Sequence, residues 1–349
     1  MPANEQEQVV TEAIRIEKVD VLFGARRQDA LQMLDAGESR SRILEETGVV
    51  VGVADATLTV PEGEICVLMG LSGSGKSTLL RTVNRLNPST RGSVTVLTTH
   101  GEVRVSDCDA DTLRRVRQES VTMVFQQFAL LPWRTVRENV GFGLELKGVP
   151  KADRRRIVDQ KLEMVHLAQW ADRYARELSG GMQQRVGLAR AFATDADILL
   201  MDEPFSALDP LIRSHLQDEL LTLQRELKKT ILFVSHDLDE ALKLGQQIVI
   251  MDEGRIVQCG VPAEIWRNPA TDYVRRFVAR INPLEALTAS VVMSPLTEGT
   301  PLDGLPRIEG DKSLRDVLKT RGDAPCVVVV EQGKPVGFID NDCVLQQLR

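Results

Sequence analysis

The sequence lacks several features that would assign it to common classes of protein. It contains no run of about 20 consecutive apolar residues, the length that crosses a bilayer as a helix. Its N-terminus, MPANEQEQVV, has neither a basic nor an apolar segment, so we expect no export signal. If the protein serves a process at a membrane, we expect another chain to supply the membrane-spanning part.

Paired cysteines and an excess of positive charge are also missing. The five cysteines show no C-x-x-C pair and no histidine at metal-ligand spacing, so we expect free thiols in a reducing compartment. They are Cys66, Cys108, Cys259, Cys326 and Cys343. The net charge of -7 argues against a nucleic-acid partner, because neutralising phosphates requires clustered Lys and Arg.

Short apolar segments alternate with helix-like ones, which predicts an α/β fold with a largely parallel, helix-covered sheet. The expected strands are ICVLMG, ADILLMDEP, KKTILFVSHD and QQIVIMDEGRIV. A β-branched run over 48–60, followed by the turn PEGE, predicts a further strand. The clearest helix-like segment is LIRSHLQDELLTLQREL.

Three regions depart from this alternation and define the expected domains. Residues from about 25 to 47 are charged and helix-permissive, and form an expected insertion. Residues from about 133 to 178 form an expected helical subdomain, in which Arg154 to Arg156 are either a solvated face or a phosphate site. We expect one large domain over 1–280 and a small module over 281–349.

The segment GLSGSGKS matches the phosphate-binding pattern G-x-x-x-x-G-K-[ST] and lies between an expected strand and the expected helix KSTLLRTVNRL. Its backbone N–H groups can wrap phosphate oxygens, Lys76 can reach the β- and γ-phosphates, and Ser77 can offer its hydroxyl to Mg²⁺. The expected ATP-binding residues are Gly70, Leu71, Ser72, Gly73, Ser74, Gly75, Lys76, Ser77 and Thr78.

The segment ILLMDEP supplies two carboxylates at the end of an apolar strand. Asp202 can hold Mg²⁺ through water, and Glu203 can orient and deprotonate the attacking water. The alternative is a strand that ends in a solvated acidic turn. Beside the phosphate-binding loop, this segment predicts an ATP-hydrolysing enzyme in which Lys76 and Glu203 are catalytic.

The segment LSGGM, followed by QQRVGLARA, resembles the signature of ABC-type ATPases, whose usual form has Gln where this chain has Met182. Ser179, Gly180 and Gly181 begin a helix and can form a second phosphate-binding surface. The resemblance implies a P-loop ATPase fold with an antiparallel β subdomain and a helical subdomain. It also implies that two copies pack head to tail, with each γ-phosphate between one P-loop and the opposing signature.

Other family elements follow in order, and the resemblance implies their roles. Gln126 resembles the glutamine that senses Mg²⁺ and the attacking water, with Gln127 as the alternative. Asp209, in SALD, resembles the loop along the dimer seam, and His236 resembles the histidine that bonds the γ-phosphate. Phe23 resembles the aromatic residue that stacks on adenine, and a core phenylalanine is the alternative.

The wording of these motifs resembles the ATP-binding subunits of glycine betaine, proline and choline importers. Such subunits usually end in a tandem pair of CBS motifs, whereas this tail has one convincing repeat, 314–348, after the degenerate stretch VVMSPLTEGTPLDGL. The shorter tail favours the choline branch. The resemblance implies ATP and Mg²⁺, a homodimer at the cytoplasmic face of the cell membrane, a membrane permease, a periplasmic or lipid-anchored solute-binding protein, and no nucleic acid.

Alternative functions remain open. The chain could energise import of another small solute, act as a non-transport ABC ATPase on nucleic acid, or be a nucleotide-sensing regulator without turnover. The long coiled-coil insertions and basic linkers of the nucleic-acid class are not seen in the sequence. Phe128, Leu130, Leu131 and Trp133 are either a groove for a short helix of the membrane subunit or core residues.

Overall fold

The computed structural model describes residues 11–279, 282, 284, 287–296, 304–331 and 333–348, with side chains as far as residue 345. The N-terminal segment MPANEQEQVV lies outside these residues. The chain divides into two compact units, Met1–His236 with Val249–Ile256, and Asp237–Ile248 with Val257–Arg349. Each unit is described by itself, and the division into domains over 1–280 and 281–349 stays a prediction.

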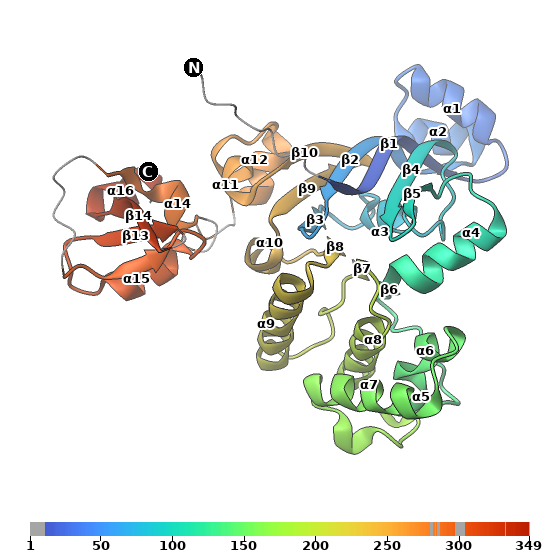
Figure 1. Ribbon diagram of the computed structural model, residues 1–349. Helices are drawn as coiled ribbons and strands as arrows, with labels where there is room; N and C mark the ends of the chain where they lie inside the picture. Colours follow the sequence, from blue (N-terminus) through green and yellow to red (C-terminus); the bar gives the residue numbers. More distant parts are fainter. Residues whose placement is uncertain are drawn as a thin grey trace, which may run out of the picture. The chain divides into compact units, whose positions relative to one another are not determined.

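The first unit contains a four-stranded sheet in the order β2-β1-β4-β5, in which all neighbours are antiparallel. Its strands are β1 (Glu12–Phe23), β2 (Val50–Pro61), β4 (Arg91–Thr98) and β5 (Gly101–Arg104). Buried side chains such as Ile14, Ile16 and Val94 join those of the second sheet in one apolar core. The expected antiparallel β subdomain is therefore present (Figure 1).

The second sheet has six strands in the order β10-β9-β3-β8-β7-β6, and its four strands from β3 to β6 are parallel neighbours. The strands are β3 (Ile65–Met69), β6 (Val121–Val124), β7 (Ile198–Asp202), β8 (Thr230–Val234), β9 (Gln247–Asp252) and β10 (Arg255–Gly260). Every residue of β3, β7 and β8 is buried, as expected for strands covered on both faces. Because carboxyl ends of parallel strands meet at one edge, this sheet gathers the segments that follow β3, β7 and β8.

The helix after the phosphate-binding loop is shorter than predicted. The prediction extended over KSTLLRTVNRL, whereas α3 spans only Lys76–Leu80. Beyond it the amides of Thr82, Val83 and Arg85 bond the carbonyl three residues earlier, and Arg85 has a positive φ of 55°. This tighter bonding ends the α-helix, and Thr82 adds a side-chain bond to the carbonyl of Leu79.

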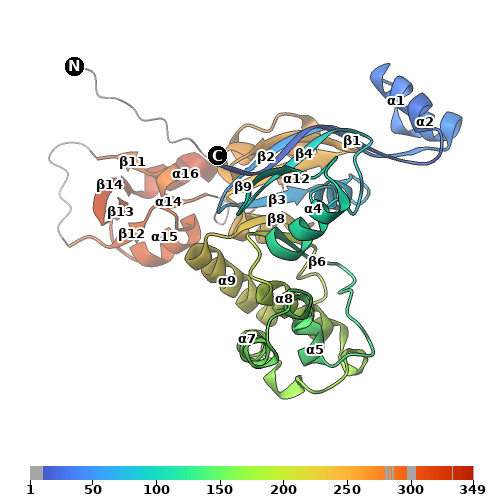
Figure 2. The same ribbon diagram turned by 45° about the vertical axis from the view of Figure 1, so that its right-hand side comes forward.

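The region from 25 to 47 folds into two short helices, α1 (Arg27–Asp35) and α2 (Arg40–Thr47). The Ser39 side chain caps α2, and Gly48 ends it in the left-handed conformation. The two helices bury Ala30, Leu34 and Ile43 in a small core with residues of β1 and β2. We refer to α1 and α2 together as the insert (Figures 1 and 2).

A group of helices covers the residues between β6 and β7, as predicted for this region. These elements are α5 (Val136–Val140), α6 (Phe142–Leu146), α7 (Lys151–Met164), η2 (Ala168–Trp170), η3 (Ala175–Glu177) and α8 (Gly180–Ala193). Arg154 and Arg155 approach the carboxylates of Glu145 and Asp159 at 3.8 and 3.9 Å. These local ion pairs favour the solvated face over a phosphate site.

Three further elements of the first unit connect the strands. They are α4 (Ala110–Arg115), the π-helix η1 (Val116–Ser120) and α9 (Pro210–Leu227). Helix α9 matches the predicted segment LIRSHLQDELLTLQREL and begins with Pro at its first turn.

The second unit contains a four-stranded sheet in the order β11-β14-β13-β12. Its elements are α10 (Leu238–Leu244), α11 (Pro262–Arg267), α12 (Asp272–Val278), α14 (Ala289–Val292), β11 (Ser294–Pro295), β12 (Arg307–Glu309), α15 (Leu314–Arg321), β13 (Val327–Glu331), β14 (Lys334–Ile339) and α16 (Asn341–Leu348). The predicted helix, strand, turn, strand and helix over 314–348 are confirmed. The degenerate stretch before them falls partly outside the described residues. None of the described helices is long and apolar enough to cross a membrane.

Candidate functional site

The phosphate-binding loop depends on glycines that no other residue could replace. Gly70 has a φ of 143°, and a Cβ there would lie 2.1 Å from the carbonyl oxygen of Met251. Gly75 has a φ of 99°, and a Cβ there would lie 2.4 Å from the carbonyl oxygen of Gly52. Both contacts are with backbone, so the loop can keep this shape only with glycine at these positions.

Lys76 is folded back onto the loop that precedes it. Its ammonium donates to the carbonyl oxygens of Gly70 and Leu71, both at 2.8 Å, and the residue is 7% exposed. Burial lowers the pKa of this ammonium, and the nearby carboxylates of Glu203 and Asp202 partly oppose the shift. A cation held in this way can pair with phosphate oxygens that enter the loop.

Ser77 and Asp202 meet at the carboxyl edge of the six-stranded sheet. The Ser77 hydroxyl donates to Asp202 Oδ1 at 2.6 Å, and the Arg81 guanidinium donates to Oδ2 at 2.8 Å. Asp202 is fully buried, so these two contacts stabilise its charge. Hydroxyl and carboxylate oxygens are ligands that Mg²⁺ prefers, so the pair fits this ion. Among the described residues there is no cluster of three or more His, Cys, Asp or Glu that could hold a metal without the nucleotide.

Glu203 is the point at which three of the predicted catalytic residues meet. Gln126 Nε2 donates to Glu203 Oε2 at 3.1 Å, and His236 Nδ1 lies 3.4 Å from the same oxygen. The Glu203 amide donates to the carbonyl of Val234 at 3.1 Å, which fixes the residue despite its positive φ of 48°. This geometry favours Gln126 over Gln127.

The signature residues occupy the start of α8. The Ser179 hydroxyl accepts from the amide of Met182 at 3.4 Å, and Gly181 lies so close to Ala207 that a Cβ would be 3.1 Å from its carbonyl oxygen. Asp209 caps α9 by accepting from the amide of Ile212 at 3.1 Å. The described contacts of Ser179 and Asp209 are thus made with the helices that they begin.

Phe23 lies beside the start of α3. It pairs with Val50 across the strands, and its ring edge would be 2.8 Å from a Cβ on Gly52, with Thr78 Cγ2 at 3.0 Å from the same point. The residue is 39% exposed, which a core phenylalanine would not be. The exposed ring next to the P-loop favours base stacking.

Two residues of α8 complete the site and were missed in the sequence. Gln184 is fully buried, donates to the carbonyl of Glu203 at 3.2 Å and accepts from the amide of Ala207 at 3.1 Å. Arg190 donates to the carbonyls of Phe128 and Ala129 at 2.9 and 2.8 Å, and burial lowers its pKa. The available signal was a pair of long polar side chains in the otherwise apolar helix that follows the signature.

Comparisons with known proteins place this site in a family. Residues 53–206 match the ABC transporter family. The chain is 47% identical over 326 residues to the glycine betaine transport ATP-binding protein OpuAA of Bacillus subtilis, with 93% of this chain and 76% of the relative covered. It is 41% identical over 335 residues to the trimethylamine N-oxide transport system ATP-binding protein TmoW of Ruegeria pomeroyi, with 94% of each chain covered.

A solved structure agrees with these relatives. The dimeric post-hydrolysis structure of the ATP-binding cassette MJ0796, bound to ADP and Pi, superposes with a TM-score of 0.61 at 30% identity, covering 71% of this chain and 98% of that one. The resemblance found in the motifs is confirmed. The chain therefore belongs to the ATP-binding subunits of ABC transporters, enzymes that couple ATP hydrolysis to transport, in the group of glycine betaine and osmoprotectant uptake systems.

Proposed function

We propose that two copies of this chain bind two MgATP molecules head to tail and that closing and opening of this dimer drives uptake of a small methylated amine. The observation that carries the proposal is the convergence on one sheet edge of the Ser77–Asp202 pair, at 2.6 Å, and of Gln126 and His236 on Glu203, at 3.1 and 3.4 Å.

Each side chain then has a role in hydrolysis. Glu203 accepts a proton from the attacking water as the water oxygen bonds to the γ-phosphorus and the bond to the ADP oxygen breaks. Gln126 orients Glu203 and the water, and His236 donates to the γ-phosphate. Ser77 and Asp202 would hold Mg²⁺, which neutralises phosphate charge when bound. Lys76 binds the β- and γ-phosphates.

The second half of each site comes from the other copy. Ser179, Gly180 and Gly181 offer a hydroxyl and helix-end amides to the γ-phosphate of the partner's nucleotide, and Asp209 lies at the seam. The solved MJ0796 cassette is itself a dimer with ADP and Pi, which supports this arrangement. Loss of the γ-phosphate removes the contact between the two halves, so the dimer opens after hydrolysis.

The segment after Gln126 supports docking to a membrane permease. Trp133 is 68% exposed, and Phe128, Leu130 and Leu131 are half-buried. Such partly exposed apolar side chains suit a groove for a short helix of the permease. The subunit would lie at the cytoplasmic face of the cell membrane, and a periplasmic or lipid-anchored binding protein would deliver the solute to the permease.

For the transported solute we propose a compact molecule with a methylated nitrogen. OpuAA is a glycine betaine transport protein and TmoW a trimethylamine N-oxide transport protein, and both solutes carry such a nitrogen. Choline shares this group, and the preference for choline stays a prediction. An importer for another small solute is the alternative.

Turnover is tested with Glu203→Gln, which keeps the shape of the side chain and removes the base. We expect ATPase activity to fall by at least about 100-fold while MgATP binding is retained and a dimer accumulates. The control is Glu226→Gln on the exposed side of α9, which should leave all three quantities unchanged. A Glu203→Gln protein that stays monomeric with MgATP would contradict the head-to-tail site.

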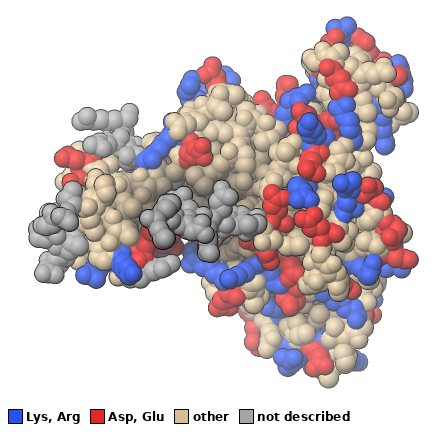
Figure 3. Space-filling model, turned by 45° about the horizontal axis from the view of Figure 1, so that its top comes forward, with Lys and Arg blue, Asp and Glu red and all other residues tan. Residues whose placement is uncertain are grey.

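The solute is tested by reconstituting this chain with its permease in vesicles and measuring uptake of labelled glycine betaine, choline and trimethylamine N-oxide. We expect ATP-dependent uptake of at least one of them and none with Glu203→Gln. Figure 3 shows basic and acidic side chains intermixed on one face of the molecule rather than gathered by sign. ATPase stimulation by DNA or RNA, with no uptake of any solute, would instead support the nucleic-acid alternative.

A further inference from the structure

The insert places an arginine against the phosphate-binding loop. Arg40, at the start of α2, donates from Nη1 to the carbonyl oxygen of Gly73 at 3.3 Å. Its neighbour Arg42 pairs with the carboxylates of Glu38 and Glu46, both at 2.9 Å. Arg40 makes no ion pair within the described part of the chain, so its charge meets only a neutral carbonyl at the rim of an anion-binding loop.

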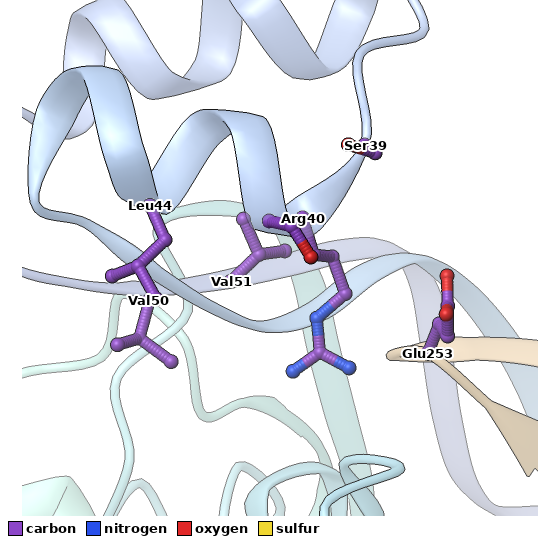
Figure 4. Close-up of a pocket in the computed structure, with 7 residues that line it drawn as sticks. Ser39, Arg40, Leu44, Val50, Val51 and Glu253 are labelled. Carbon is purple, nitrogen blue, oxygen red and sulfur yellow. The ribbon is translucent and has the colours of Figure 1, made fainter.

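Arg40 also lines a pocket of about 290 Å³ that the insert builds onto the nucleotide site. The lining residues come from α2 and its cap, from the start of β2, and from the turn after β9; they are Ser39, Arg40, Ser41, Leu44, Val50, Val51 and Glu253. In Figure 4 the Arg40 side chain extends away from α2 past β2, and Glu253 comes from the opposite side. The turn that carries Glu253 is itself joined to the P-loop, because the Gly254 amide donates to the carbonyl of Ser74 at 3.1 Å.

The pocket adjoins the aromatic ring proposed for base stacking. Val50 lines the pocket and lies directly opposite Phe23 in the antiparallel pair, so the two side chains lie on the same face of the sheet. Leu44 and Val50 are both about half exposed, and they give the pocket an apolar wall on the side of Phe23. A ligand that covered this wall and reached Arg40 would have an apolar, planar part and an anionic part.

We propose that the insert is a wall of the ATP site, in which Arg40 binds a phosphate of the nucleotide and Leu44 contacts the nucleoside. The inference rests on the proposed function, because it assumes that the P-loop binds ATP. A guanidinium forms stronger and better oriented bonds with phosphate oxygens than with a peptide carbonyl. The bond to Gly73 is long, so exchanging it for a phosphate contact costs little.

The plain structural alternative is that Arg40 fastens α2 to the P-loop and never touches the nucleotide. The two roles differ in what they change. A fastening residue stabilises the nucleotide-free protein, whereas a phosphate-binding residue changes affinity for any polyphosphate. A nucleoside contact, in turn, changes affinity for ATP and leaves tripolyphosphate binding unaltered.

The test uses the full chain and calorimetric titration with MgATP and with magnesium tripolyphosphate. We expect Arg40→Ala to weaken binding of both by about tenfold, and Arg40→Lys to recover part of the loss. We expect Leu44→Ser to weaken MgATP binding by about threefold and to leave tripolyphosphate binding unchanged. Arg42→Ala is the matched control, since it removes an arginine from the same helix, and both affinities should stay at the wild-type value.

Thermal unfolding without nucleotide separates the outcomes. If Arg40→Ala lowers the unfolding temperature while both affinities stay at the wild-type value, Arg40 only fastens the helix and the proposal is overturned. Should Arg40→Ala fail to fold, Arg40→Lys and Arg40→Gln are compared, and equal affinity for tripolyphosphate would overturn it. If the wild-type chain binds no MgATP, the proposed function itself fails, which is distinct from the failure of Arg40 alone.

Discussion

The carboxyl edge of the six-stranded sheet and the C-terminal module bury different kinds of side chain. At the sheet edge Lys76, Gln184 and Asp202 are buried, and each has hydrogen-bonding partners. Among the described residues of 287–345, every buried side chain is apolar or a cysteine. Burying charge is unfavourable unless function requires it. The contrast indicates that chemistry is confined to the sheet edge, whereas the module is held together by packing alone.

The largest expected effect comes from replacing one glycine at the sheet edge. Gly75→Ala would place a Cβ 2.4 Å from the carbonyl oxygen of Gly52 and would also strain a φ of 99°. We expect MgATP binding and ATPase activity to fall below detection, and stability to fall by about 2–4 kcal/mol. Titration with MgATP and denaturant unfolding measure the two quantities.

The control for this variant is Gly101→Ala, in the turn between β4 and β5. It has a similar φ of 104°, but a Cβ there meets nothing within 4 Å. We expect a loss of only about 1 kcal/mol and unchanged ATPase activity. Equal losses in both variants would show that strain, and not the close backbone approach, limits the loop.

A packing variant in the C-terminal module should have the opposite profile. Leu314 is fully buried in the core of the module, so Leu314→Ala should destabilise the module by about 2–5 kcal/mol. Because the sheet edge holds the catalytic side chains, we expect basal ATPase activity to stay within about twofold of wild type. Calorimetric unfolding and steady-state hydrolysis are the measurements.

Leu345→Ala provides the comparison, since this leucine is about half exposed on α16 and should cost well under 1 kcal/mol. A parallel loss of ATPase activity in Leu314→Ala would break the separation between chemistry and packing. A point variant is cleaner than deleting the module, because Ala263 and Trp266 of α11 pack in the same core and deletion would uncover them.

The smallest expected effect concerns pH. Burial lowers the pKa of Lys76 below its ordinary value near 10.5, so between the two values the unfolded chain binds more protons than the folded chain. Within that window stability rises as pH rises. Bound triphosphate favours the ammonium, so MgATP binding should take up protons and weaken as pH rises toward the lowered pKa.

Titration at alkaline pH in two buffers with different ionisation enthalpies measures this proton uptake. The apparent binding enthalpy should depend on the buffer for the wild-type chain. Lys76→Arg keeps its charge over the same range, so any binding that it retains should not depend on the buffer. Buffer independence in the wild-type chain would mean that Lys76 stays charged without nucleotide.

Local motifs made most of the site predictable. Gly70 to Thr78 form a single loop and helix start, and the strand before Asp202 and Glu203 is apolar throughout, so spacing alone indicated both. The C-terminal elements were predictable for the same reason. Helix α3 was predicted too long because the local bonding of Thr82 and Arg85 is not visible in an apolar pattern.

Contacts between distant segments could not be predicted. Arg40 reaches Gly73 across 33 positions, and Gln184 reaches Glu203 across 19, and neither pairing follows from periodicity. The choice of Gln126 over Gln127 likewise depends on where β6 ends relative to Glu203. Sequence reasoning identified the residues that carry charge toward phosphate, and only the fold identifies those that hold them.

Helix α8 acts as a rigid lever between two contact surfaces. Arg190 grips the backbone of Phe128 and Ala129 near one end, and Ser179 begins the helix at the other. Eleven residues of helix separate them, a length of about 16 Å that does not stretch. A displacement of the apolar segment by a membrane partner would therefore reach the signature serine without attenuation, and nucleotide exchange on one copy could be timed by movement at the membrane.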